Sequence, residues 1–122
     1  MNLSQIINTL VSEIKLTEIQ AKIFLHIVIH GKMNTSQISN DLNISFGDAV
    51  TNCKKLVELG GFIDMPNDEF EAMHPRFTAV NMYRKMCERE QKEFKKNLDI
   101  DNIGVALEVS YDDARTKYNK KM

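Results

Sequence analysis

The sequence predicts a mainly α fold with a small β-hairpin. Three observations predict it. Apolar residues recur at steps of three and four along most of the chain, residues able to cap a helix precede most of these stretches, and two short extended runs follow a pair of glycines. The length of 122 residues fits one ordinary domain, and a composition that is 43% apolar and 27% charged excludes collagen-like and disordered chains.

Two helices are expected in the first thirty residues. Ser4 has a side chain suited to capping the first helix, which we expect to end near Lys15. Thr17 is suited to capping a second helix over residues 18–30, and Gly31 lets the chain leave that helix. Each helix carries one apolar face. The apolar positions are Ile6, Ile7, Leu10, Val11 and Ile14 in the first helix, and Ile19, Ile23, Phe24, Ile27 and Val28 in the second.

A shorter helix, a tight turn and a longer helix are expected next. Thr35 or Asn34 caps the shorter helix, over residues 36–42. Ser45 caps the longer helix, which we expect to reach about Leu59 before two glycines stop it. The inward positions of the longer helix are Ala49, Val50, Cys53, Leu56 and Val57.

Past the two glycines the apolar pattern changes from helical to extended. Residues 62–65 and 70–73 are short extended runs, and residues 66–69 between them are a Pro-Asn-Asp-Glu cluster typical of turns, so a hairpin is expected. Helical spacing returns from about Phe77 in a long, exposed helix, and a last helix follows Leu98. The apolar seams of these two helices contain Val80, Tyr83, Cys87 and Phe94, and then Ile103, Leu107, Tyr111, Ala114 and Tyr118.

This order of elements is that of a winged helix-turn-helix. We therefore expect a winged helix-turn-helix domain over residues 1–75 and a C-terminal helical dimerisation region over residues 76–122. Pairing the two apolar seams between two copies would bury surface that one chain leaves exposed, which predicts a homodimer. The residues expected at that interface are Val80, Tyr83, Cys87, Phe94, Ile103, Leu107, Tyr111 and Tyr118.

One part of the chain also resembles a known family. Residues 16–25, LTEIQAKIFL, resemble the opening signature of the archaeal TrmB-type transcriptional regulators, in which a leucine-threonine start leads to an acidic or amide residue, an alanine and an aromatic residue. Residues 34–39 resemble the start of that family's second helix. Residues 70–75 resemble its second wing strand and the entry to its dimer helix. The resemblance covers roughly residues 16–98.

The resemblance implies a dimeric, sequence-specific transcriptional regulator that binds double-stranded DNA through a recognition helix beginning near Ser45. Longer members of the family carry a C-terminal sugar-binding domain. The residues after Leu98 are too few to encode such a domain, so we expect no sugar effector, and no other cofactor is expected.

Thr51, Asn52 and Lys55 are the side chains expected to be free to reach base edges, because Asn can pair with adenine and Lys with guanine. Ser36 and Gln37, at the start of the preceding helix, would meet phosphates. The expected DNA-binding residues are Ser36, Gln37, Ser45, Phe46, Gly47, Thr51, Asn52, Lys54, Lys55, Arg84 and Lys85.

Charge is unevenly distributed, although the formal net charge is only −1. Residues 76–96 contain seven basic and three acidic residues, a local charge of +4 that would attract phosphate. Residues 64–71 of the hairpin contain four carboxylates and no Lys or Arg, so we expect the hairpin to be held off DNA. Asp48 stabilises a helix start through the macrodipole but would repel phosphate there.

A second function stays open on these observations. Phe46 and Gly47 offer neither charge nor a hydrogen-bonding side chain where the TrmB-type family commonly has a basic or polar pair. Together with the acidic hairpin, this is compatible with a winged-helix module that binds a basic protein partner and no DNA. The solvated face of an amphipathic helix would show the same pattern.

No catalytic, metal or membrane motif is expected. His26 and His30 have the spacing of two ligands on one helix face, but no third ligand is evident nearby, so we expect a surface pair. Cys53 and Cys87 are expected to be reduced, Cys53 as a core residue. The sequence lacks a phosphate-binding loop, a nucleophile elbow and a His-Glu-x-x-His motif, which predicts a non-enzyme. It also lacks a secretory signal and a long apolar run, which predicts a cytoplasmic protein with no membrane partner.

Overall fold

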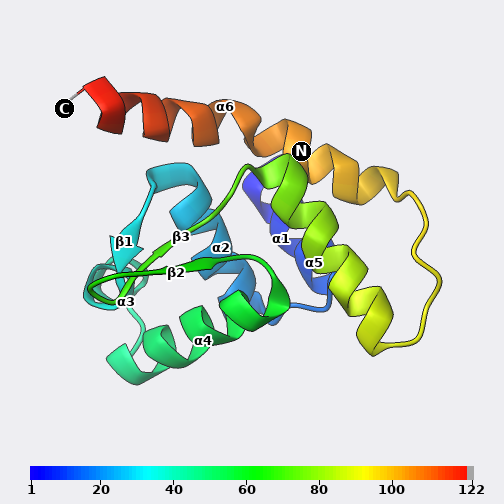
Figure 1. Ribbon diagram of the computed structural model, residues 1–122, viewed down its shortest axis with the longest axis horizontal. Coiled ribbons are helices and arrows are strands. Elements are labelled where there is room, and N and C mark those ends of the chain that lie inside the picture. Colours follow the sequence, from blue (N-terminus) through cyan, green and yellow to red (C-terminus); the bar gives the residue numbers. More distant parts are fainter. Residues whose placement is uncertain (121–122) are drawn as a thin grey trace.

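The protein is mainly helical, with one small antiparallel sheet, as expected. The computed structural model describes the backbone of residues 1–120 and the side chains of residues 1–116. The helices and strands in that part are α1 (Leu3–Glu13), α2 (Glu18–His30), β1 (Met33–Asn34), α3 (Thr35–Leu42), α4 (Phe46–Leu59), β2 (Ile63–Met65), β3 (Glu69–Glu71), α5 (Pro75–Arg89) and α6 (Leu98–Lys120) (Figure 1).

The first two helices begin at reciprocal caps. Asn2 caps α1, and the prediction that Ser4 does so is wrong. The backbone N–H of Gln5 donates to Asn2 Oδ1 at 2.9 Å, while the Gln5 side chain accepts from the backbone N–H of Asn2 at 2.9 Å. Thr17 caps α2 as predicted, in the same reciprocal arrangement with Gln20. Two otherwise unpaired backbone donors are satisfied at each start.

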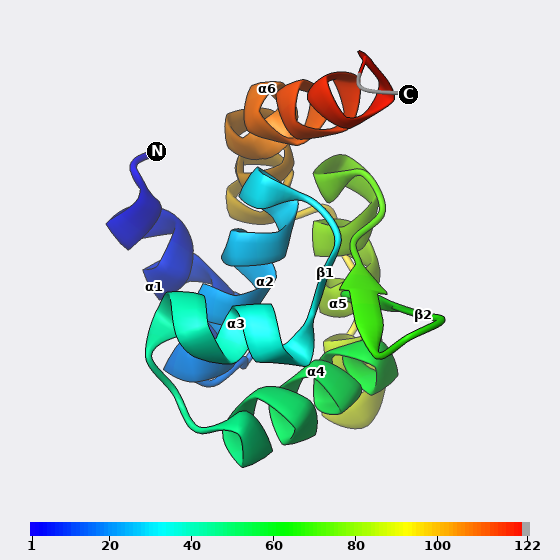
Figure 2. The ribbon, with the colours of Figure 1, turned by 90° about the vertical axis from the view of Figure 1, so that its left-hand side faces the viewer.

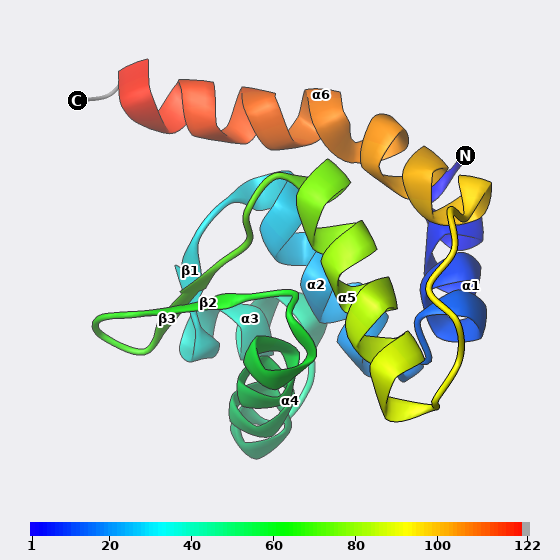
Figure 3. The ribbon, with the colours of Figure 1, turned by 45° about the vertical axis from the view of Figure 1, so that its right-hand side comes forward.

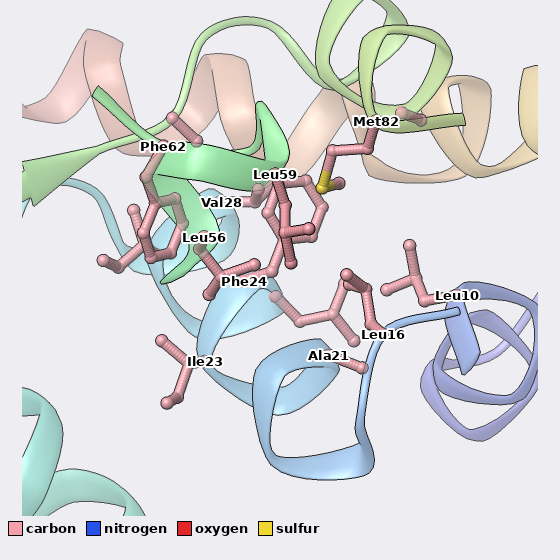
Figure 4. Packing of buried hydrophobic residues seen from close by; sticks show 14 of the residues in the cluster. Leu10, Leu16, Ala21, Ile23, Phe24, Val28, Leu56, Leu59, Phe62 and Met82 are labelled. Atoms are coloured by element: carbon pink, nitrogen blue, oxygen red, sulfur yellow. The ribbon is translucent and has the colours of Figure 1, made fainter. Parts of the chain in front are cut away.

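A single hydrophobic core joins the helices to the sheet. Phe24 of α2 is fully buried, and its ring centroid lies 6.1 Å from that of Phe62 (Figure 4). The same cluster contains Leu10 of α1, Met82 of α5 and Ile103 of α6. Helices from both sides of the expected boundary between residues 75 and 76 therefore share one core.

The sheet contains one strand that the sequence analysis missed. The predicted hairpin is present as β2 and β3, and β1 pairs with β3 to give the order β1-β3-β2. Asn67 and Asp68 in the hairpin turn have φ of 65° and 58°, which these two residue types tolerate better than most. The two residues of β1 are too few to show the alternation that marks a strand.

α5 begins at Pro75 and ends at Arg89, so it is shorter than predicted. Phe94 lies in the connection to α6, where its ring centroid is 6.0 Å from that of Tyr83. α6 then crosses one end of α1, α2 and α5 (Figures 1 and 3). A Cβ on Gly104 would lie 2.7 Å from the Arg76 Cα, so a glycine is needed where α6 crosses α5.

None of the helices within the described residues is both long enough and apolar enough to cross a membrane.

Candidate nucleic-acid interface

α3 and α4 are joined by a turn that local hydrogen bonds define. Asn34 caps α3, and Asn43 leaves it in the left-handed conformation with φ 55°. The Ser39 hydroxyl donates to the carbonyl oxygen of Ile44 at 2.6 Å. Ser45 then caps α4 as predicted, accepting from the backbone N–H of Asp48 at 3.0 Å. These bonds set the direction in which α4 leaves α3. In Figure 2, α4 lies at the bottom of the molecule, with the β2–β3 hairpin at one side.

α4 has one buried and one exposed face. The inward face packs into the core, and burial raises the pKa of the Cys53 thiol to about 12, so this thiol stays neutral at physiological pH. The interpretation of Cys53 as a core residue is therefore confirmed. Cys87 is also a buried free thiol. The exposed residues of α4 are Phe46, Gly47, Asp48, Thr51, Lys54, Lys55 and Glu58.

Two of the three side chains predicted to reach base edges are available on this face. Thr51 is exposed, and so is Lys55, whose Nζ lies 3.3 Å from Glu58 Oε2. An exposed ion pair of this kind contributes about 0–1 kcal/mol, so a phosphate or a base could displace Glu58. Lys54 is exposed as well.

The structure corrects the prediction that Asn52 is free to reach a base edge. Its Nδ2 donates to the backbone carbonyl of Asp48 at 2.9 Å, and its Oδ1 accepts from Gln20 Nε2 at 3.4 Å. Both ends of the amide are thus engaged within the chain, and the side chain is half-buried. Asn52 connects α4 to α2 and is not free to reach a base edge.

The N-terminal ends of α3 and α4 offer few free polar groups. Ser36 and Gln37 are exposed as expected, but Gln37 Oε1 accepts from the backbone N–H of Asn34 at 3.0 Å. Phe46 is 55% exposed and apolar. Gly47 has room for a side chain, because a Cβ built there would meet Ser45 Oγ at 4.0 Å, an ordinary van der Waals contact. Of the predicted residues at this end, Ser36 is the one whose exposed polar side chain takes no part in a cap.

The basic stretch of residues 76–96 is mostly paired. Five of its seven cations lie within 4.0 Å of a carboxylate: Arg76 with Glu108, Arg84 with Glu88, Lys92 with Glu90, Lys95 with Glu93, and Lys96 with Asp101. The hydrogen bond from Lys92 lowers the pKa of Glu90 and raises that of Lys92. Lys85 and Arg89 have no ion pair within the described side chains. Most of the cations that give this stretch its local charge of +4 are therefore already paired with a carboxylate.

Arg84 and Lys85 lie beside the C-terminal end of α4. Arg84 Nη2 donates to Asn81 Oδ1 at 2.6 Å, and Asn81 Nδ2 donates to the carbonyl oxygen of Gly60 at 3.1 Å. The stem of Lys85 packs on Gly60, where an added Cβ would come within 2.9 Å of its Cδ. The structure thus places these two predicted DNA-binding residues next to the helix that carries Lys54 and Lys55.

The hairpin presents fewer free carboxylates than its sequence suggests. Glu71 forms an ion pair with Arg115 of α6, and Glu69 lies 4.0 Å from Lys32 Nζ. Asp64 and Asp68 are exposed and have no ion pair within the described side chains. Two of the four carboxylates are therefore oriented toward the molecule and two toward solvent.

The residues expected between two chains are only partly available. Cys87, Ile103 and Leu107 are buried in their own chain, which corrects the expectation that a single chain leaves them exposed. Val80, Tyr83 and Tyr111 are half-buried, Phe94 is exposed, and the side chain of Tyr118 lies outside the described residues. These helices form their seam with one another and with the core. The sequence analysis missed a second apolar stripe on the outer face of α6, which contains Leu98, Val105 and Val109.

Two histidine clusters bear on metal binding. His26 Nε2 lies 2.8 Å from Asp41 Oδ2 of α3, and the ring centroids of His26 and His30 are 4.6 Å apart. His26 thereby connects α2 to α3. The second cluster, which includes His74, was not predicted.

His74 Nε2 lies 3.7 Å from Glu108 Oε1 and 4.0 Å from Asp112 Oδ1. His74 Nδ1 accepts from the backbone N–H of Arg76 at 3.1 Å, which assigns the proton of a neutral ring to Nε2. A metal on Nε2 would require that proton to move and the Arg76 hydrogen bond to break. The arrangement fits a polar junction between α5 and α6 better than a metal centre.

Comparison with known proteins gave no relative of this chain. No family model matches it, no curated protein matches it, and no solved structure matches it. The resemblance of residues 16–98 to TrmB-type regulators therefore rests on the residues of this sequence alone.

Proposed function

We propose that the protein is a winged helix-turn-helix transcriptional regulator that binds double-stranded DNA as a homodimer. α3 and α4 serve as the helix-turn-helix, and the β2–β3 hairpin serves as the wing. Residues 45–55 of each chain enter successive major grooves. The observation that supports this most is the exposed, polar face of α4, which carries Thr51, Lys54 and Lys55 and is presented by the capped turn after α3.

Electrostatics set the expected strength of binding. On the exposed face of α4, Lys54 and Lys55 are balanced by Asp48 and Glu58, so one chain attracts phosphate only weakly. Arg84 and Lys85 add two cations beside the end of α4. A dimer doubles this set of four cations to eight. Eight phosphate contacts would give a slope of log K against log salt that is no steeper than about −7.

A second copy is proposed to cover the outer face of α6. Leu98, Val105 and Val109 are 67%, 54% and 69% exposed, and their spacing of seven and then four places them along one side of the helix. Pairing this stripe about a two-fold axis would bury apolar surface that the chain itself leaves uncovered. The proposed dimer therefore uses the outer face of α6, since the predicted seam already packs within each chain.

The test is binding to a random-sequence DNA duplex at about 50 mM and about 200 mM salt, measured by fluorescence anisotropy alongside the oligomeric mass. We expect a dimer with a steep salt dependence. The double variant Lys54→Glu/Lys55→Glu should weaken binding at least tenfold, and Arg84→Glu/Lys85→Glu should weaken it by less.

Lys95→Glu/Lys96→Glu is the matched control, because it makes the same charge change at two adjacent lysines in the connection between α5 and α6. It should change the affinity less than threefold. Absence of binding at about 50 mM salt, or equal losses in the α4 variant and the control, would contradict the proposal.

A second candidate function is a protein-interaction module whose wing binds a basic partner. It is favoured by Asp64 and Asp68, which are exposed on the hairpin without an ion-pair partner in the described side chains. A lysine-rich peptide is the probe. If this function holds, the peptide should bind the wild type and lose most of its affinity for Asp64→Asn/Asp68→Asn, while the duplex fails to bind.

A further inference from the structure

A cavity lies between the second half of α6, the connection from α2 to β1, and the sheet. Its volume is about 230 Å³, and its lining includes His30, Lys32, Met65, Glu71, Ala114 and Arg115. These residues come from α6, from the end of α2 and the connection that follows it, and from both strands of the hairpin. In Figure 1 this region lies under the C-terminal half of α6, away from α4. The cavity is therefore separate from the proposed DNA surface.

The lining combines cationic and apolar groups. Lys32, Arg115 and the imidazole of His30 contribute nitrogen atoms, whereas Glu71 contributes the one carboxylate among the described residues of the lining. Met65 and Ala114 provide apolar wall. Such a lining suits a ligand with one anionic group and a small apolar body. The volume is below the range of about 300–1,000 Å³ that is usual for drug-sized ligands, so the ligand is a small molecule.

Arg115 is the group that would hold the anion. Its Nη1 donates to the carbonyl oxygen of Val28 at 2.5 Å, its Nη2 pairs with Glu71, and its guanidinium lies 3.7 Å from the centroid of the Tyr111 ring. Its Nε is buried and has no hydrogen-bond partner within the described residues. A buried donor without an acceptor is unfavourable, so Arg115 would gain from an additional oxygen atom.

Glu71 can give up part of its contact with Arg115. Its Oε1 also accepts from the backbone N–H of Ala72 at 2.8 Å, so this carboxylate keeps a partner when the guanidinium turns toward a ligand. Glu69 already pairs with Lys32 at the margin of the cavity, at 4.0 Å. A ligand carboxylate would thus compete with carboxylates of the sheet for the same two cations.

We propose that this cavity binds a small organic carboxylate. The carboxylate accepts hydrogen bonds from Arg115 and pairs with Lys32, while the apolar part of the ligand contacts Met65 and Ala114. Binding replaces Glu71 as the main partner of Arg115 and so loosens the connection between β3 and α6. This site does not depend on the proposed function, because it lies apart from α4 and is tested by direct binding.

The probe is benzoate, with benzamide as the uncharged molecule of the same shape and inorganic phosphate as an anion without an apolar body. Amide NMR shifts are followed during titration of the full chain. We expect benzoate to shift the amides of residues 30–32, 71–72 and 114–115 saturably, and benzamide and phosphate to shift them much less.

Two conservative variants sharpen the test, because Arg115→Ala could fail to fold. Lys32→Gln should weaken benzoate binding about tenfold by removing a charge-assisted contact, and Glu71→Gln should strengthen it several-fold by removing the competing carboxylate. Lys92→Gln, an exposed lysine elsewhere, should leave it unchanged. Equal shifts with benzamide, benzoate shifts confined to other residues, or an unchanged affinity in Lys32→Gln would overturn the proposal.

Discussion

The start of α4 and the end of α6 are positioned in opposite ways. α4 is set by bonds between close neighbours in sequence, such as Ser45 with Asp48 and Ser39 with Ile44. α6 is anchored by Arg115, which donates to groups that are 87, 88 and 44 positions away in the sequence. The difference shows that the start of the proposed recognition helix is set by near neighbours in the sequence, whereas the position of α6 depends on the folded molecule as a whole.

Removal of Arg115 should produce the largest effect, because it breaks the long-range anchor of α6. Arg115→Ala leaves Glu71 partly buried without its cation and removes the side-chain donor to the carbonyl oxygens of Val28 and Ile27, of which Ile27 still accepts from the backbone N–H of Gly31. Breaking a buried pair costs about 3–5 kcal/mol, and this pair is somewhat exposed, so we expect a loss of roughly 2–3 kcal/mol in the free energy of unfolding in urea.

Arg89→Ala is the control, because Arg89 is exposed and has no ion pair within the described side chains. It should change the free energy of unfolding by less than about 0.5 kcal/mol. A double-mutant cycle with Glu71→Ala should give a coupling energy above about 1 kcal/mol. A coupling energy near zero would show that α6 is anchored by its apolar contacts alone.

Two glycines should respond to the same substitution with opposite signs. Gly104→Ala places a Cβ 2.7 Å from the Arg76 Cα at the crossing of α6 and α5, and such overpacking costs about 1–3 kcal/mol. Gly47→Ala adds its Cβ without a clash on the first turn of α4, where better helix propensity should stabilise by up to about 1 kcal/mol. Thermal unfolding of both variants checks this. Destabilisation by Gly47→Ala would contradict the exposed position of that residue.

The burial of Cys53 on the inward face of α4 predicts that the stability of the fold depends on pH. The thiol has a pKa of about 12 in the folded chain and a reference value of 9.0, so between these values the folded state holds a proton that the unfolded state releases. Stability therefore falls as pH rises above about 9, by at most about 1.4 kcal/mol per pH unit.

Cys53→Ala removes this titration. Its stability deficit relative to the wild type, measured by urea unfolding, should therefore shrink by up to about 1.4 kcal/mol between pH 9 and pH 10. A deficit that stays constant over this range would mean that the thiol is accessible in the folded chain.

Loss of a single cap should have the smallest effect. Ser45→Ala removes the acceptor for the backbone N–H of Asp48 and should cost about 1 kcal/mol. Ser45→Asp, which keeps an acceptor, should restore most of that stability. If Ser45→Ala costs as much as Arg115→Ala, the start of α4 is not held by local bonds alone.

The sequence predicts the parts of the fold that depend on near neighbours. Thr17 and Ser45 cap helices as expected, and the Pro-Asn-Asp-Glu cluster turns the hairpin. The cap at Asn2 was missed because Ser4 is an equally suitable capping residue two positions later. β1 was missed because its two residues carry no periodic signal of their own.

The candidate site was predicted less well, because side-chain partners far apart in sequence leave no local pattern. Asn52 has the amide that suits adenine, but Gln20, 32 positions away, engages it. The basic stretch of residues 76–96 looked available to phosphate, yet Arg76 pairs with Glu108, 32 positions later. Tyr111 was assigned to the dimer seam, but in the structure it lies between His74 and Arg115.

The central proposal is that the exposed face of α4 binds DNA, and mapping the contact surface tests it most directly. Amide NMR shifts of the whole chain would be recorded while a random-sequence duplex is added at low salt. The proposal predicts shifts concentrated at residues 36–37, 45–55 and 84–85, which disappear in Lys54→Glu/Lys55→Glu. Shifts confined to the hairpin and α6, or no shifts at all, would contradict it.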